Sequence, residues 1–403
     1  MTSLVEHPTA QALLDQTTVT AAALRPTVER LDAFLDRYRP YFLRSEQRHN
    51  ALLVLRGKLS GLDRKTCEPL AREAGVPRRT IQQFVGEGCW DDAAVRAELQ
   101  AHVAEQIGHA DGVLIVDGMA VPKKGTESCG VARQWCGRLG KVDNCQVGVY
   151  LGYAARGGHA LLDAQLYLPQ ERAAGRDHRQ KTHVPAAVTF QEKWRLALNL
   201  IATATVPHGW VTGDDEFGRA SAFREGLRSA RQRYVLDVPS NSLVRDLRAA
   251  RPAGTRVPPW ETAAAWAARQ PARAWRTITV RDGEKGPLQV KVVETMAQAK
   301  DDDGKAGARE RLVVLRSVVG PARTWYVLSN ARHGESLTAV VRAQASRHRI
   351  EELFAEGNGE IGLDHCEVRS WRGWQHHVTL SLLALWYLQV EKRRLGKKRR
   401  GSP

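Results

Sequence analysis

Apolar residues recur at helical spacing through the N-terminal quarter of the chain. Two series are visible, one at Leu31, Phe34, Leu35 and Tyr38 and the other at Leu52, Leu53, Leu55 and Leu59. Side chains three or four positions apart share one face of a helix, so both series indicate amphipathic helices. Residues 1–105 are therefore predicted to form an all-helical N-terminal region.

A helix-turn-helix pattern runs from Thr66 to Phe84 within this region. A short helix ends at Gly75, Pro77 contributes to the turn, and a second helix follows. The second helix carries the candidate DNA-binding residues Arg78, Arg79 and Gln82, together with Gln83. Such side chains can reach phosphates and base edges from a major groove. An ordinary pair of packed helices shows the same pattern, so both interpretations stay open.

From residue 113 onward the pattern becomes that of strands. The apolar run Val113–Val116 ends at Asp117, and Trp210–Gly213 ends in the same way at Asp214. Short apolar runs of this kind are typical of buried strands. Further strands are predicted at 146–154, 160–168 and 233–238, and a helix at 190–201. The mixture predicts an α/β core.

Residues 243–320 have the pattern of an insertion into this core. A stretch rich in Pro, Gly and Arg (251–259) precedes strand patterns at 277–280, 288–293 and 311–319. Three tryptophans of this segment, Trp260, Trp266 and Trp275, could stack on a displaced base or simply pack in a core. We expect four segments: a helical DNA-binding region (1–105), a first core part (106–242), a β-rich insertion (243–320) and a second core part (321–403).

The second core part begins with a strand at 324–328. A helix that Ser336 can cap follows, and it carries Glu351. A last helix is predicted at 379–390, running into the basic tail 392–400.

Charge narrows the choice of partner. The 60 Lys and Arg against 44 Asp and Glu leave a formal net charge of +16, with a pI near 9.9. Such an excess favours nucleic acid first and an anionic membrane surface second, while a solvated basic surface without a partner stays open. The first residues show no secretory signal, and the longest apolar stretch is about half a membrane span, so we expect a cytoplasmic protein with no membrane partner. Scattered cysteines without a CxxC pair indicate reduced thiols rather than zinc.

Three acids stand where two strands and a helix would bring them to a common crevice: Asp117, Asp214 and Glu351. Carboxylate oxygens hold Mg²⁺ or Mn²⁺, and two such ions about 4 Å apart can activate the attacking oxygen and stabilise the leaving oxygen of a phosphodiester. Each acid alone is weak support, because an Asp after a strand is common in loops and a Glu on a helix is usually solvated.

The residues around the three acids resemble the motif blocks of bacterial insertion-sequence DDE transposases. The first block comprises VDGMAVPKKG at 116–125, GVARQWCG at 130–137, Gly140-Lys141 and NCQV at 144–147. The second is GDDEFG at 213–218, where the catalytic Asp of the family stands three residues before an aromatic-Gly pair, which selects Asp214 over Asp215. The third is RHRIEELF at 347–354, followed by GLDH at 362–365 and VRSW at 368–371. The blocks occur in the family's order, and the resemblance extends over nearly the whole chain.

The resemblance implies an RNase H-like catalytic core, with room for the β-rich insertion between Asp214 and Glu351. It implies that Asp117, Asp214 and Glu351 are the catalytic and metal-binding residues, with Mg²⁺ or Mn²⁺ as cofactor, two ions in all. The reaction would be cleavage at insertion-sequence ends and transfer of the 3′-hydroxyl into target DNA. The partners would be double-stranded DNA, both terminal inverted repeats and target, and a second copy in a homodimer on DNA, in the nucleoid of a bacterial cytoplasm.

Basic residues near the acids are the further candidate DNA contacts: Lys123, Lys124, Arg133, Lys141, Arg347 and Arg369. Arg347 lies four residues before Glu351 and could instead pair with that carboxylate.

Two positions depart from the family pattern. Asn358 stands seven residues after Glu351, where the family usually has Lys, and this loses a charge-assisted phosphate contact. His348 stands where an aromatic residue is often found. We include Asn358 among the candidate DNA contacts. The departures leave open a domesticated, catalytically weak or inactive transposase-derived DNA-binding protein. A metal-dependent nuclease that cuts DNA without joining it is a second alternative.

Overall fold

The structure is a computed structural model, which describes residues 21–250, 257–281, 287–318, 321–332 and 334–400. The N-terminal residues in which no secretory signal was recognised, and residues 251–256 of the stretch rich in Pro, Gly and Arg, lie outside the described residues. So do the side chains of 396–400 in the basic tail.

Between residue 21, where the described part of the chain begins, and β1, the regular elements are all helices. They are α2 (Ala21–Asp36), η2 (Arg39–Tyr41), α3 (Ser45–Lys58), α4 (Cys67–Glu73), α5 (Arg78–Gly86) and α6 (Asp92–Ile107). The apolar series explains their packing, because Leu31, Leu35 and Tyr38 are all buried. α4 and α5 form the expected helix pair, in which α5 buries Ile81 and Phe84 on one face.

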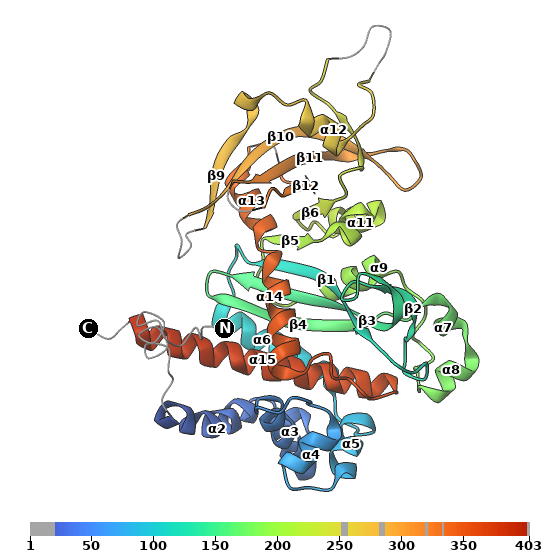
Figure 1. The fold of residues 1–403 in the computed structure, drawn as a ribbon, viewed down its shortest axis with the longest axis vertical. Coiled ribbons are helices and arrows are strands. Elements are labelled where there is room, and N and C mark those ends of the chain that lie inside the picture. The colour runs from blue at the N-terminus through green and yellow to red at the C-terminus, as the bar shows by residue number, and fades with distance from the viewer. Residues whose placement is uncertain (1–20, 251–256, 282–286, 319–320, 333, 401–403) are drawn as a thin grey trace, which may run out of the picture.

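A mixed sheet of twelve strands forms the centre of the molecule, in the order β2-β3-β1-β5-β6-β12-β11-β10-β7-β8, with β4 beside β3 and β9 beside β10. Its first strands are β1 (Val113–Pro122), β2 (Ala132–Cys136), β3 (Lys141–Ala155), β4 (Gly158–Leu166), β5 (Trp210–Gly213) and β6 (Tyr234–Val238). The others are β7 (Leu243–Asp246), β8 (Glu261–Thr262), β9 (Arg276–Arg281), β10 (Leu288–Lys300), β11 (Ala306–Ser317) and β12 (Thr324–Ser329). β1, β5 and β6 are parallel to one another, whereas β12 runs antiparallel to both β6 and β11. The strands of segment 243–320 thus continue the same sheet through the β11–β12 pair (Figure 1).

The remaining helices surround this sheet. They are α7 (Gln170–Ala174), α8 (Arg176–Lys181), α9 (Lys193–Ala202), α10 (Asp215–Arg219), α11 (Ser221–Ser229), α12 (Ala263–Ala268), η3 (Ala272–Ala274), α13 (Leu337–Ala345), α14 (His348–Glu356), η4 (Gly357–Ile361) and α15 (Trp371–Arg400). α14 packs on β1, β3 and β4, which brings the third motif block onto the sheet. α15 lies between β4 and the N-terminal helices α3 and α5 (Figure 1).

α15 begins well before the predicted residue Thr379. Its first turns contain polar side chains that interrupt the apolar run, yet they are buried with partners. His376 bonds through Nδ1 to the carbonyl of Val85 (3.1 Å), and His377 through Nε2 to that of Leu363 (2.9 Å). Among the helices described, none has the uninterrupted apolar length that a bilayer crossing requires.

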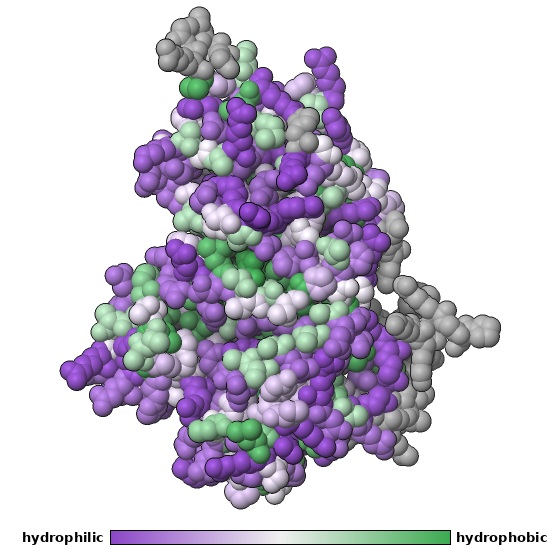
Figure 2. All heavy atoms as spheres, turned by 180° about the vertical axis from the view of Figure 1, so that it is seen from behind, coloured by the Kyte–Doolittle hydropathy of each residue, from purple (hydrophilic) through white to green (hydrophobic). Residues whose placement is uncertain are grey.

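A second apolar cluster contains Trp266 and other residues of segment 243–320, together with Val238 of β6 and Leu328 of β12. Trp266 is 1% exposed, and its Nε1–H donates to Asp246 Oδ2 at 2.8 Å. Stacking of Trp266 on a base is therefore ruled out, and the core-packing interpretation is correct for this residue. Seen from behind, the surface is mainly hydrophilic, and apolar residues gather where the upper and lower halves of the molecule meet (Figure 2).

Candidate active site

Three aspartates stand at the same level on three neighbouring strands. The parallel register pairs Val116 of β1 with Gly213 of β5, and Gly213 with Leu236 of β6. The residues that follow these positions are Asp117, Asp214 and Asp237. Since neighbouring strands lie about 4.8 Å apart, the three aspartates form a row across the sheet. We call this set the aspartate row.

Asp214 is held by the turn that begins α10. Its carboxylate accepts hydrogen bonds from the backbone N–H groups of Glu216 (3.0 Å) and Phe217 (3.4 Å). Phe217 is fully buried, and a Cβ added to Gly218 would lie only 1.8 Å from the carbonyl oxygen of Asp237. The aromatic-Gly pair of the second motif block therefore allows α10 to pack directly on β6.

Glu351 is connected to the row through Arg347. Arg347 Nε lies 3.1 Å from Asp237 Oδ2, and Arg347 Nη1 lies 2.9 Å from Glu351 Oε1. His348 Nδ1 lies 3.0 Å from the second oxygen of Glu351. Gln344 Nε2 donates to Asp237 Oδ1 at 3.0 Å. The pairing of Arg347 with Glu351, one of two interpretations left open by the spacing, is thus present in the structure.

The pKa values reflect first the burial of these carboxyl groups and then their proximity to one another. Burial, and after it the charge of Asp214, raises the pKa of Asp117 to about 8. Burial also raises the pKa of Asp214 to about 6, with further contributions from Glu216 and Asp215, and that of Asp237 to about 6. Against the lowering effect of burial, nearby carboxylates raise the pKa of Arg347. Burial thus disfavours the charged forms of these carboxyl groups, and a bound cation would favour them.

A cavity of about 340 Å³ adjoins Asp117 and Asp214. Asn358 from η4 lines it, and its Oδ1 is buried without a hydrogen-bond partner among the residues described. Lys193 from α9 also lines it, with Nζ 2.6 Å from Glu216 Oε1. Asn358, seven residues after Glu351, therefore faces the same space as Asp117 and Asp214.

Residues 37–287 match a family model described as DDE superfamily endonuclease, which is more than half of the chain. The chain belongs to this family. The match includes Asp117 and Asp214 but ends before Glu351, and it confirms the resemblance recognised in the motif blocks.

A similar curated protein is the "Probable transposase for insertion sequence element IS701" of Microchaete diplosiphon. It is 30% identical over 224 residues, which cover 54% of this chain and 56% of that protein, so the chain spans about half of its relative's length. A solved structure, the NurA nuclease from Sulfolobus solfataricus, covers 77% of this chain and 94% of its own with 9% identity and a TM-score of 0.27. That likeness is too weak to support an argument about fold or chemistry.

The donor set of this DDE endonuclease suits a hard divalent cation. Carboxylate oxygens are the ligands that Mg²⁺ and Mn²⁺ prefer, and Asp117 and Asp214 are two such groups beside one cavity. Within the described ranges, no three side chains of His, Cys, Asp or Glu are already grouped so that they could hold one ion. Glu351 is instead paired with Arg347 and His348, so it would have to leave these partners to become a ligand.

Asp237 and Lys193 were not among the residues predicted from the sequence. One feature of the sequence could have indicated Asp237, because it is an acid inside an otherwise apolar strand. Burying a carboxylate without a partner is costly, so such an acid is expected to have a specific partner in the fold. Lys193 begins α9 after a long connection. Its neighbours in the sequence do not indicate that it lies beside the cavity that contains Asp117 and Asp214.

The candidate DNA contacts lie in separate places. Arg78, Arg79 and Gln82 are exposed on α5, which lies across α15 from the sheet and away from the aspartate row (Figure 1). Lys124, Arg133, Lys141 and Arg369 are also exposed, whereas Lys123 Nζ donates to the carbonyl of Cys366. Arg347, with its side chain 20% exposed, is enclosed by carboxylates. Contact with DNA remains a prediction for all of them.

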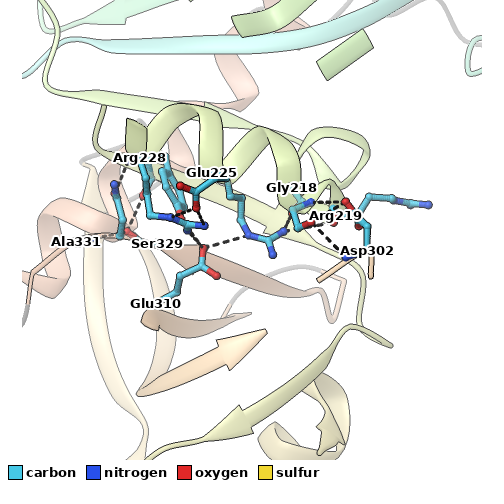
Figure 3. A network of polar contacts seen from close by, with 12 residues as sticks. Gly218, Arg219, Glu225, Arg228, Asp302, Glu310, Ser329 and Ala331 are labelled. Atoms are coloured by element: carbon cyan, nitrogen blue, oxygen red, sulfur yellow. Dashed lines mark hydrogen bonds and ion pairs between the residues drawn. The ribbon is translucent and has the colours of Figure 1, made fainter. Parts of the chain in front are cut away.

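A buried polar network ties the helices after Asp214 to segment 243–320 (Figure 3). Glu310 of β11 is 1% exposed, and its Oε1 lies 3.2 Å from Arg224 Nε and 3.5 Å from Arg228 Nη1. Arg224 also donates to the carbonyl of Gly218 in α10. The position of α10, and with it the turn that holds Asp214, therefore depends on a strand of the segment between the second and third motif blocks.

Proposed function

We propose that this DDE endonuclease is a DNA transposase that cuts the ends of an insertion sequence and joins them to target DNA. The observation that supports this most is the in-register placement of Asp117 and Asp214 on parallel strands, with Glu351 reaching the same cluster through Arg347. The relative described as a probable transposase supports the same proposal.

In this proposal Asp117, Asp214 and Glu351 hold two Mg²⁺ or Mn²⁺ ions. Ions bound there supply Lewis-acid polarisation of the phosphodiester and lower the pKa of the attacking hydroxyl or water. Asp237 keeps Arg347 beside the row, so that Arg347 can turn toward a phosphate once Glu351 is engaged elsewhere. Lys193, beside the same cavity, adds a cation near the position of the DNA strand.

Cleavage breaks the bond between phosphorus and the 3′ oxygen, and water supplies the new oxygen on phosphorus. The freed 3′-hydroxyl then attacks a phosphodiester of target DNA at the same site, and the target's own 3′ oxygen leaves. Joining two ends to one target requires a homodimer on DNA, acting in the nucleoid of a bacterial cytoplasm. α4 and α5 serve as the helix-turn-helix that recognises the terminal inverted repeats.

Cleavage of DNA that contains the sequences flanking the gene tests the proposal. The wild-type protein should nick this DNA in Mn²⁺ but not in EDTA, whereas Asp117→Asn should bind the DNA and leave it intact. Asp111→Asn, a change of the same kind at an exposed residue, is the matched control and should cut normally. Binding without nicking by the wild-type protein would instead favour a DNA-binding protein without chemistry.

Strand transfer is tested separately with a pre-cleaved end that carries a free 3′-hydroxyl. Joined products support transposition. Hydrolysis without joined products would identify a nuclease that cuts DNA but does not join it.

A further inference from the structure

A second cavity, of about 520 Å³, is formed by strands of the upper half of the sheet and by the helices α13 and α14. The strands contribute apolar side chains to it: Val280 of β9, Val290 of β10, and the directly paired Leu315 of β11 and Trp325 of β12. Val341 and Ala345 of α13, which packs against β9, also line it. We call this space the α13 cavity. Its volume lies within the range of sites that bind small molecules.

The apolar lining of the α13 cavity is incompletely covered by the protein itself. Leu288 of β10 lines the cavity and is 45% exposed, whereas Val290, two positions along, is 8% exposed. Leaving a leucine in contact with water is unfavourable, and a ligand with an apolar body would remove this surface from water. The cavity therefore suits a ligand that is apolar over much of its length.

The charged side chains of the α13 cavity favour an anionic group on that ligand. Arg323, just before β12, and Arg342 of α13 are exposed, and neither forms an ion pair with an acid in the described part of the chain. On the wall as described, Glu351 is the one acid, and Arg347 and His348 already pair with it. The cavity of the candidate active site differs, because three acids line it. An anion in the α13 cavity can thus pair with a guanidinium that has no carboxylate partner.

We propose that the α13 cavity binds a small organic anion with an alkyl or aryl body. The apolar body lies against Leu315, Trp325 and Val341, and the anionic group pairs with Arg342 and Arg323. A DNA strand is a poorer match, because its charges repeat along a polar backbone, whereas these arginines accompany an apolar recess.

The ligand lies beside the aspartate row without occupying it. Trp325 and Arg347 line the α13 cavity and also a neighbouring cavity that contains Asp214 and Asp237, so they form the boundary between the two spaces. The inference goes beyond the proposed function and does not depend on it, because binding of the anion requires neither DNA nor a metal ion.

The test uses the intact protein and 1-anilinonaphthalene-8-sulfonate, an aryl sulfonate that becomes fluorescent in apolar surroundings. The wild-type protein should bind this probe at a saturable site, and decanoate should displace it. 1-Decanol has the same chain length without the charge. It should displace the probe about tenfold less well, because it cannot form a charge-assisted hydrogen bond with an arginine.

Two variants locate the site. Arg342→Gln should bind the probe about tenfold more weakly, because the anion loses one guanidinium partner. Ala345→Trp should fill the cavity and abolish the binding that decanoate displaces. Arg309→Gln, at an exposed arginine of β11 outside the cavity, is the matched control and should bind the probe as wild type does. Urea denaturation checks that each variant is folded, and Arg342→Gln, at an exposed position, decides the matter if Ala345→Trp does not fold.

Unchanged probe affinity in Arg342→Gln would overturn the inference, and so would equal displacement by decanoate and 1-decanol, because the anionic group would then not be recognised. Displacement of the probe by a short DNA duplex, with Arg342→Gln weakening the duplex as much as the probe, would overturn it in favour of a DNA contact. None of these results would alter the proposed function, which the cleavage and strand-transfer experiments test.

Discussion

At the scale of single residues, Arg347 is the cation around which the site is organised. It contacts Asp237 and Glu351 directly, and its charge also lowers the pKa values of Asp117 and Asp214 from what burial alone would give. One guanidinium thus partly neutralises four carboxylates from the sheet and α14. Removing a partner of a buried charge is more costly than removing an exposed pair.

Asp237→Asn should therefore lower the free energy of unfolding by about 2 kcal/mol, because Arg347 loses an ionic partner in a largely enclosed position. Urea denaturation at neutral pH measures the change. Asp215→Asn, which alters the neighbouring exposed pair with Arg219, is the matched control and should change stability by less than about 0.5 kcal/mol. Equal effects of the two substitutions would show that Asp237 does not stabilise Arg347.

Lys58 gives a pH dependence that is separate from the active site. It is 2% exposed, burial lowers its pKa to about 8, and its Nζ lies 3.5 Å from the carbonyl oxygen of Ile361. Its charged form is thus disfavoured in the folded protein relative to the unfolded chain. Below pH 8 both states are protonated and the full cost of burial is present. Above pH 8 the folded state loses the proton first, so stability due to Lys58 rises with pH.

Lys58→Met should accordingly be more stable than wild type at pH 7, by about 1–3 kcal/mol, and this advantage should shrink by pH 9. Cys67, Cys366, Lys65 and Asp364 lie near Lys58 and are the same in both proteins, so the difference between the two unfolding curves reports the removal of the Lys58 charge. An advantage that stays constant from pH 7 to pH 9 would mean that Lys58 does not change protonation in this range.

At the scale of elements, the position of α10 is set from two sides. Gly218 allows it to contact β6 closely, and the network around Glu310 attaches it to β11. Glu310→Gln should lower the free energy of unfolding by about 3–5 kcal/mol, because Arg224 then remains buried without its counter-charge and Arg228 keeps only Glu225. Glu225→Gln removes the other, exposed ionic partner of Arg228. In the same denaturation experiment it should lower the free energy of unfolding by less than about 0.5 kcal/mol. Comparable losses would contradict the assignment of Glu310 as the buried anchor.

The elements themselves were largely predictable from local pattern. Val113–Val116 and Trp210–Gly213 are strands that lead to Asp117 and Asp214, and the helix pair at α4 and α5 lies where Gly75 and Pro77 indicated. The long-range pairings were not predictable, because nothing local specifies that β11 pairs with β12 or that β6 lies beside β5. Asp237 was missed for this reason, since its role depends on the register with Gly213 and on contact with Arg347.

At the scale of the whole molecule, the net charge of +16 governs how DNA binding should respond to salt. If the exposed basic residues contact phosphates, the affinity for DNA should fall by about a thousandfold between about 50 and 200 mM salt. Binding releases cations that are condensed on the DNA, and this release is less favourable at higher salt. Lys124→Ala should reduce the slope of log affinity against log salt by about one. Lys305→Ala, at the exposed β10–β11 turn beside Asp303, should leave the slope unchanged. Identical slopes for all three proteins would remove Lys124 from the DNA contacts.

The central claim is that Asp117, Asp214 and Glu351, far apart in the chain, bind the same divalent ions. Titration of Mn²⁺ followed by electron paramagnetic resonance tests it directly, with the intact protein and without DNA. Asp117→Asn, Asp214→Asn and Glu351→Gln should each weaken Mn²⁺ binding by about tenfold or more, since each removes a charged oxygen ligand. Glu352→Gln, one position along the same helix and paired with Arg349, should bind Mn²⁺ as wild type does. Wild-type affinity in all three carboxylate variants would contradict the account.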